Sequence, residues 1–173
     1  MPFAYYAKLS PSRQRIYRQS DAIQSLELPP GLEAGARVAR IRASLAGADR
    51  AGVQKACQEL IDALGAGYRV PQIRVRVLAQ RPADDDGELH GLYEPDDEGT
   101  PARITVWMRT AARKDVVAFK TFLRTLIHEL CHHLDYELYK MPETFHTEGF
   151  YKRESTLVAA LLAEESTQGD LLG

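Results

Sequence analysis

The segment His128-Glu129-Leu130-Cys131-His132 carries the clearest chemistry in the chain. In a helix, which turns by about 100° per residue, its two histidines lie about 40° apart around the axis and one turn apart along it. Two imidazoles in that arrangement can bind one Zn²⁺ ion. Glu129 points about 100° away from His128, where it can take the proton of a zinc-bound water whose pKa the ion lowers to about 7. The spacing therefore predicts a zinc site with Glu129 as the general base.

A catalytic zinc site has three protein ligands and one open position, so the pair needs a third residue. His146 follows His132 by 14 residues, after a break at Pro142, and a returning loop can bring it to the metal. Glu154 is the alternative, because it shares an apolar stripe of a helix expected over 147–165, where an unpaired carboxylate would be costly. Glu154 can be the third zinc ligand, or it can accept a hydrogen bond from the other ring nitrogen of a histidine that binds the zinc. We expect His146, with Glu154 open as the alternative ligand.

Four further residues lie close to these in the sequence. Asp135 falls on the ligand face of the helix, where it can accept the free N–H of a ligating histidine, although a surface position is the alternative. His133 is rotated away from His132 and is expected to be exposed or to contact a ligand. Tyr151 can donate a hydrogen bond to the oxyanion of a tetrahedral intermediate, although packing is the commoner role. Cys131 faces the apolar side and is expected to be a small buried residue.

Apolar periodicity predicts the elements that position these residues. The segment 115–138 has a helical stripe opposite the two histidines (Leu123, Ile127, Leu130 and Leu134). Earlier helices are expected from a Ser10-Pro11 cap to about Leu26 and after a cap at Asp49. Strands are expected over 73–79, 88–93 and 103–108, with a turn at 82–87. The order indicates one α+β domain over 1–173, with a helical part over 1–66 and the sheet and active-site helices over 68–173.

Composition limits the class of protein. The 173 residues are 45% hydrophobic and 27% charged, which is ordinary for one soluble domain. We expect no membrane segment, because no apolar run approaches about 20 residues, and a cytoplasmic location, because two cysteines and no leader pattern are present. Residues 1–82 carry 13 Lys/Arg and 6 Asp/Glu, a charge of +7, and the remainder carries −9. A nucleic-acid partner is not expected, because no aromatic residues interleave the basic ones.

With these residues identified, the chain resembles the zincin metallopeptidases and, within them, the SprT-like group. His128, Glu129 and His132 match the H-E-x-x-H motif, and His146 and Phe150 match a third histidine some 15 residues on with an aromatic residue four positions later. The similarity covers about 122–151. The third-histidine segment lacks the usual His-Gly start, and no cysteine-rich module follows. The second choice is a resemblance to the small gluzincins, which implies Glu154 as the third ligand.

The resemblance implies a zincin-like fold in which a small, mostly antiparallel sheet packs on the motif helix, and a C-terminal helix follows. It also implies an edge strand beside the cleft, for which 103–108 is the candidate, and a peptide or protein substrate lying along it. The implied activity is peptide-bond hydrolysis by a zinc-bound water that Glu129 activates, with one zinc per chain. The alternative is a regulatory or scaffold protein that keeps the fold and binds metal without turnover. The role of residues 1–66 stays open between a prodomain, a recognition surface and a part of the domain.

Overall fold

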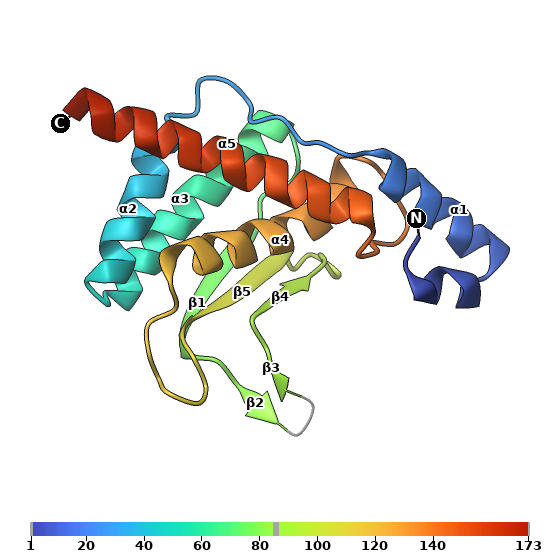
Figure 1. Ribbon diagram of the computed structural model, residues 1–173, viewed down its shortest axis with the longest axis horizontal. Coiled ribbons are helices and arrows are strands. Elements are labelled where there is room, and N and C mark those ends of the chain that lie inside the picture. The colour runs from blue at the N-terminus through green and yellow to red at the C-terminus, as the bar shows by residue number, and fades with distance from the viewer. Residues whose placement is uncertain (1, 85–86, 173) are drawn as a thin grey trace.

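The computed structural model of the protein describes residues 2–84 and 87–172, so the centre of the turn expected at 82–87 lies outside the described residues (Figure 1). The fold is α+β. A 3₁₀ helix, η1 (Ala4–Lys8), is followed by α1 (Pro11–Ala22), α2 (Ala34–Ala46), α3 (Arg50–Tyr68), β1 (Arg74–Gln80), β2 (Ala83–Asp84), β3 (Gly87–Glu88), β4 (Gly91–Glu94), β5 (Arg103–Arg109), α4 (Phe119–Glu137) and α5 (Glu148–Leu172).

The helix caps confirm the local sequence signals. The Ser10 side chain accepts a hydrogen bond from the backbone of Arg13, and the Asp49 side chain accepts one from Gly52. Helix α1 nevertheless ends at Ala22, before the expected end at about Leu26. The next residues run extended along α5, where the Thr156 hydroxyl accepts a hydrogen bond from the Leu26 backbone. Tertiary hydrogen bonds therefore replace the last helical turn that the sequence predicts.

Helix α4 begins at Phe119, four residues after the start expected from its apolar pattern. The residues before it pair with the end of β5 instead. Val116 forms an isolated bridge with Arg109, and the Val117 backbone N–H donates to the Met108 carbonyl. Residues that were expected in the first turn of this helix therefore form hydrogen bonds with the sheet instead.

The main sheet has three strands in the order β1-β5-β4. Strand β1 pairs with β5 in parallel, with Val77 opposite Val106, whereas β4 pairs with β5 antiparallel, with Gly91 opposite Val106. The sheet is therefore mixed, and the expectation of a mostly antiparallel sheet is wrong. The expectation that 103–108 forms the edge is wrong too, because β5 lies between the other two strands and is buried on both faces. The edge strand is β4.

The two edges of this sheet differ in whether other parts of the chain form hydrogen bonds with their backbone groups. Side chains of α3 bond the free edge of β1: Gln58 accepts from the Val75 N–H at 2.8 Å, and Gln54 accepts from the Val77 N–H at 3.1 Å. Arg50 donates to the Val77 carbonyl at 3.2 Å. Within the described residues, β4 makes backbone hydrogen bonds only with β5. Strand β4 therefore presents an open edge, whereas the edge of β1 is already occupied.

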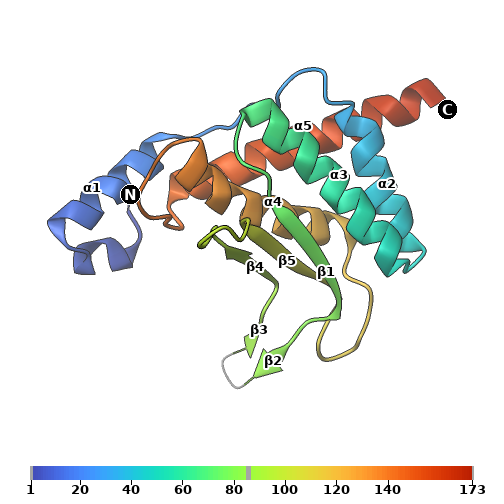
Figure 2. The ribbon, with the colours of Figure 1, turned by 180° about the vertical axis from the view of Figure 1, so that it is seen from behind.

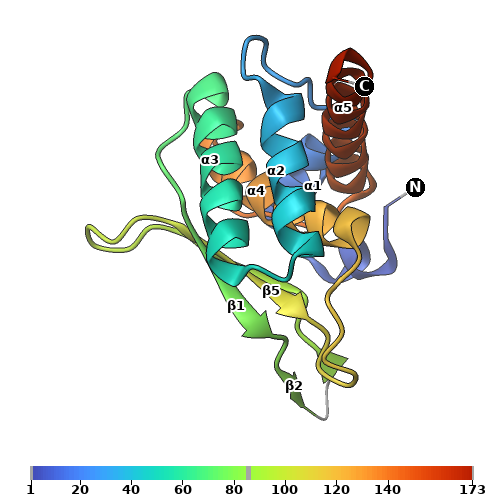
Figure 3. The same cartoon turned by 90° about the vertical axis from the view of Figure 1, so that its left-hand side faces the viewer.

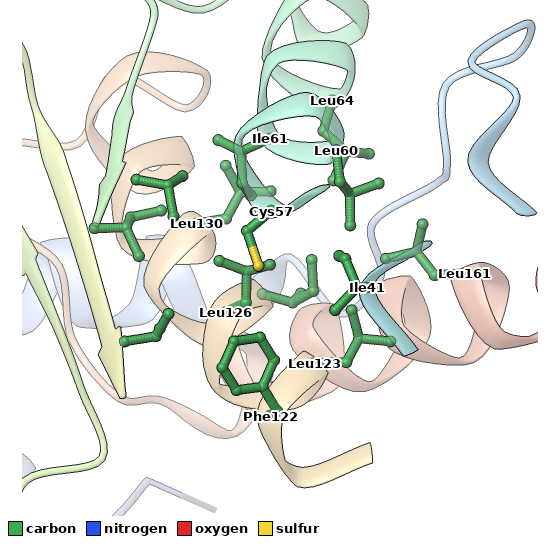
Figure 4. Close-up of a cluster of buried hydrophobic side chains, with 14 of the residues drawn as sticks. Ile41, Cys57, Leu60, Ile61, Leu64, Phe122, Leu123, Leu126, Leu130 and Leu161 are labelled. Atoms are coloured by element: carbon green, nitrogen blue, oxygen red, sulfur yellow. The ribbon is translucent and has the colours of Figure 1, made fainter. Parts of the chain in front are cut away.

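The helices lie on one face of the sheet (Figures 1 and 3). Helix α4 packs on β4 and β5, α3 packs on β1, and α5 packs on α4 and α2. One buried cluster includes residues from α2, α3, α4, α5, β1 and β5; among its members are Ile41, Cys57, Leu60, Phe122, Leu123, Leu126, Leu130 and Leu161 (Figure 4). The expected apolar stripe of α4 is fully buried in it. The opposite face of α4, which carries His128 and His132, is thereby turned away from the core. In the described part of the chain, every helix is too short or too polar to cross a membrane.

Candidate metal centre

Three histidines converge on the wall of a cleft. His128 and His132 lie one turn apart on α4, and His146 lies in the segment that connects α4 to α5. The Nε2 atom of His146 is 3.1 Å from Nε2 of His128 and 3.0 Å from Nε2 of His132. In the described part of the chain, these three residues form the group of potential ligand atoms close enough to share one metal ion. The structure brings together the three histidines that the sequence selected.

The hydrogen bond behind His128 determines which of its ring nitrogens faces the others. Its Nδ1 atom lies 2.6 Å from Oε1 of Glu154, and the other carboxylate oxygen accepts a hydrogen bond from Arg124 at 3.1 Å. Because an ionised carboxylate can only accept, the imidazole Nδ1 carries the proton and Nε2 keeps its lone pair. Glu154 therefore lies behind a histidine, on the side opposite His146. This is the supporting position that the sequence had left open beside the ligand position.

His132 has the same tautomer for a different reason. Its Nδ1 atom lies 2.8 Å from the Thr144 hydroxyl, and that hydroxyl donates its single hydrogen to Asp135 at 2.7 Å. The hydroxyl oxygen must therefore accept from Nδ1–H, which leaves the lone pair on Nε2. Asp135 is fully buried and is held by Arg153 at 3.0 Å, so the surface position that the sequence left open is wrong. Asp135 acts on His132 through Thr144, a residue that the sequence analysis missed.

The donor set fits a divalent zinc ion. Three nitrogens about 2.0–2.1 Å from one zinc at tetrahedral angles lie about 3.3–3.4 Å apart, close to the two distances observed. The Nε2 atoms of His128 and His132 both present lone pairs, and a single N–H on His146 can donate a hydrogen bond to only one of them. Burial, with smaller contributions from His128 and His146, lowers the pKa of His132 to about 3. Burial also lowers the pKa of His146. Neutral imidazoles are the form that binds metal.

Glu129 lines the same cleft beside His128. The residue is only 7% exposed, and no hydrogen bond to its carboxylate is seen within the described residues. Burial raises the pKa of Glu129 to about 7, against the lowering effect of His128 and with a smaller rise from Glu154. A carboxyl group with a pKa near neutrality can both take and return a proton at physiological pH.

Gly91 leaves the space that Glu129 occupies. A Cβ atom at this position of β4 would lie 2.7 Å from Cγ2 of Thr125 and 2.9 Å from Oε1 of Glu129. Any larger residue would therefore push the carboxylate away from its place. The sequence analysis missed Gly91, although a glycine inside a strand is a known signal of close approach.

The cleft has a volume of about 810 Å³ and runs between β4, α4 and α5. Tyr151 lines it, with its ring centroid 6.2 Å from that of His128 and 5.7 Å from that of His146. Its side chain is 40% exposed, and its hydroxyl has no hydrogen-bond partner in the described residues. The phenol is exposed and is free to donate into the cleft, so it does not have the core-packing role that the sequence analysis gave as the commoner one.

His133 is buried, so of the two alternatives expected for it, an exposed position or a contact with a ligand, the exposed position is wrong. Its Nε2 atom donates to the Pro71 carbonyl at 3.1 Å, and its Nδ1 accepts from the Tyr93 hydroxyl at 2.8 Å. The Tyr93 ring in turn stacks on the His132 ring at 6.3 Å. His133 thereby ties α4 to the edge strand. Cys131 is buried and unpaired, as predicted, and burial raises the pKa of its thiol.

The N-terminal helices hold the segment that carries the third histidine. Figure 2 shows α1 beside the start of α5 and the connection that precedes it. The Tyr5 hydroxyl donates to the His146 carbonyl at 2.9 Å, and the Ser20 and Thr147 hydroxyls are 3.0 Å apart. The Asp21 carboxylate accepts from the Gly149 N–H at 2.9 Å. Residues near the N-terminus are therefore part of the support of the site, a role that no local sequence pattern had indicated.

Comparisons of the chain with protein-family models, curated proteins and solved structures find no match.

Proposed function

We propose that this chain is a zinc-dependent peptidase that hydrolyses peptide bonds in polypeptide substrates. The observation that carries the proposal is the convergence of three imidazole Nε2 atoms beside the buried carboxyl group of Glu129, at an open cleft. A site of three histidines with an open position is typical of catalytic zinc, whereas structural zinc sites are closed by four protein ligands. As part of the same proposal, we assign the chain to the zincins, with His146 as the third ligand.

The residues of the chain supply the acid–base chemistry. When bound, the ion would polarise the scissile carbonyl and lower the pKa of the attacking water. Glu129 takes a proton from that water and later returns it to the leaving amine, a cycle suited to a group whose pKa lies near 7. The Tyr151 hydroxyl, which is free in the described structure, donates to the oxygen on which negative charge develops.

The open edge of β4 favours an extended polypeptide as substrate. A peptide can add to this edge through backbone hydrogen bonds, which demand no particular side chains. Gly91 would bring such a peptide close to Glu129, because this position carries no side chain. We further propose a cytoplasmic location, which fits the two unpaired cysteines.

A peptide-library assay with zinc-loaded protein tests the proposal. We expect cleavage of mixed peptides, detected by mass spectrometry, that stops on addition of a chelator and returns with zinc. The variant Glu129→Gln should keep its zinc content and lose at least about 10²-fold in turnover, the usual contribution of a general base. Glu164→Gln, an exposed change on α5, is the matched control and should keep full activity.

Two results would contradict this function. A wild-type rate in Glu129→Gln would remove the proposed base. Stoichiometric zinc in a protein that cleaves no member of the library would favour the regulatory, non-catalytic alternative.

A further inference from the structure

A second groove begins where the cleft ends. It has a volume of about 1000 Å³ and lies between α3, β1 and the segment that leads from β4 to β5. Five basic residues line it: Arg50, Lys55, Arg74, Arg76 and Arg103. The acidic residues on its walls are Glu59, Glu94 and Asp97.

Most of the acidic residues in this groove are already paired. Glu94 bonds Arg103 at 2.9 Å, and Glu59 bonds Arg40 at 3.3 Å. Within the described residues, Lys55, Arg74 and Arg76 are exposed and form no ion pair. The groove therefore carries an excess of positive charge, on a protein whose net charge is −2.

Arg74 and Arg76 lie near each other without a carboxylate partner in the described structure. In the sheet register, Arg74 lies directly opposite Arg103, and Arg76 follows on the same face of β1. Glu94 already pairs with Arg103, so the uncompensated repulsion is between Arg74 and Arg76, two residues apart on one face of β1. A concave surface also concentrates their field and raises the local concentration of anions. An anionic ligand would relieve this repulsion.

The groove adjoins the cleft of the proposed peptidase. Pro95 lines both, and β4 runs from Gly91, beside Glu129, to Glu94 at the start of the groove. At about 3.3 Å per residue, four strand residues span roughly 13 Å. A polypeptide that lies along β4 would therefore leave the cleft at Pro95 and enter the groove.

We propose that this basic groove binds an acidic segment of the substrate, about four to eight residues from the scissile bond. The inference rests on the proposed function, because it takes the occupant of the cleft to be a polypeptide. The hydrogen-bonding edge of β1 is occupied by Gln54 and Gln58, so the groove recognises side-chain carboxylates and does not extend the sheet. A nucleic acid fits less well, because the described residues that line the groove include no aromatic ring on which bases could stack.

Peptide binding to the zinc-loaded Glu129→Gln variant tests the groove without relying on turnover. The probes are two labelled peptides with the same neutral core, one extended by four glutamates and the other by four glutamines, each made with the extension at either end. In fluorescence anisotropy, one glutamate peptide should bind about 5–30-fold more tightly than its glutamine counterpart, since each exposed ion pair contributes up to about fivefold. The preference should shrink as salt is raised.

Charge reversal in the groove separates specific binding from general attraction. In the Glu129→Gln background, Arg74→Glu/Arg76→Glu should abolish the preference for glutamate. The control Arg15→Glu/Arg113→Glu changes the net charge equally at exposed positions outside the groove and should retain it. Circular dichroism and thermal unfolding verify that both variants are folded.

Equal affinity for the glutamate and glutamine peptides, or an equal loss in the control, would overturn the proposal. Tight binding of a single-stranded oligonucleotide that depends on Arg74 and Arg76, without any peptide preference, would also overturn it and identify a different ligand. Acid-selective binding by a protein that cleaves no peptide would contradict the proposed function and leave the groove intact. Cleavage of the peptides without acid-selective binding would support the proposed function and contradict the proposal for the groove.

Discussion

The two histidines on α4 and the histidine in the following connection reach the same point by different means. His128 and His132 are placed by one turn of a regular helix whose other face is buried in the core. His146 has no helix or strand to place it, and its backbone is held by Tyr5, a residue 141 positions away in the chain. The comparison teaches that two-thirds of this site is local in sequence, whereas the remaining third depends on distant contacts.

One buried side chain links the two parts. The Arg153 guanidinium donates to the backbone carbonyls of Ser20 and Ile23, at 2.6 Å each, and to Asp135 at 3.0 Å. Asp135 leads through Thr144 to His132, while Ser20 belongs to the helix that supports the connection carrying His146. If the local and the distant parts of the site differ as this arrangement implies, substitutions in the two parts should have different effects on stability and on zinc affinity.

Arg153→Met should have the largest effect, because it leaves the fully buried Asp135 carboxylate without its cation. Breaking a buried ion pair in this way costs about 3–5 kcal/mol of unfolding free energy. Urea denaturation of the metal-free protein measures the loss. Arg15→Met, an exposed change on α1, is the control. A loss below about 1 kcal/mol would show that the link contributes little to the fold.

Removing a ligand from either part should abolish tight zinc binding. We expect both His132→Ala and His146→Ala to weaken the affinity for zinc by more than the 10–100-fold that loss of an outer hydrogen-bond partner costs. Competition with a chromophoric chelator gives the dissociation constants. Affinity at the wild-type level in His146→Ala would mean that the connection carries no ligand, and the comparison would fail. His90→Ala, a histidine on the cleft wall outside the cluster, is the control.

Glu154→Gln should weaken zinc binding by about 10–100-fold while His128 stays in place. The amide is neutral and can present a hydrogen to Nδ1, so it no longer enforces the tautomer that leaves Nε2 free. The same chelator competition reports the change. If Glu154→Gln bound zinc as weakly as His146→Ala, the carboxylate would be acting as a ligand and not as a support.

The pH dependence of the metal-free protein should distinguish the two histidine environments. The pKa of His132 is lowered from 6.5 to about 3 in the folded protein. Below pH 6.5 this histidine therefore binds a proton more readily in the unfolded state than in the folded state. The free energy of unfolding consequently falls as the pH falls. The raised pKa of Glu129 acts in the opposite direction between about pH 4.5 and 7. In Glu129→Gln, which removes that opposition, the unfolding free energy should drop by about 2 kcal/mol from pH 6.5 to pH 5.

Adding His132→Gln to Glu129→Gln should flatten this profile more than adding His146→Gln does. His132 is the more buried of the two side chains, and burial is the main cause of its lowered pKa. Urea titrations at a series of pH values provide the measurement. Equal flattening by the two changes would show that the helix and the connection hold their imidazoles in equivalent surroundings.

Tyr5→Phe should have the smallest effect, since it removes one hydrogen bond to the His146 carbonyl and keeps the ring. A single such bond is worth about 1 kcal/mol, so zinc affinity should fall by about fivefold or less. Burial raises the pKa of Tyr5 to about 12, so the hydroxyl keeps its proton throughout the assay range. Tyr6→Phe provides the matched control. An unchanged zinc affinity in Tyr5→Phe would show that the connection between α4 and α5 holds His146 in place without the hydrogen bond from Tyr5.

Much of the fold follows from short-range patterns. The caps at Ser10 and Asp49, the apolar stripe of α4 and the strands at 73–79 and 103–108 each depend on a few neighbouring side chains, and each lies within a few residues of its expected place. The strand order and the parallel pairing of β1 with β5 were not predictable in this way. Alternation shows which face of a strand is buried, but it does not show which strand lies beside it.

The sequence by itself determined the chemistry of the site: the one-turn spacing of His128 and His132, the acid between them, and a third histidine within reach. Only the tertiary structure decided the rest. It placed Glu154 behind His128, joined Asp135 to His132 through Thr144, and set Gly91 against Glu129. The reason is physical, because helical spacing is fixed by the backbone within a few residues, whereas these contacts join separate elements whose approach depends on how the whole core packs.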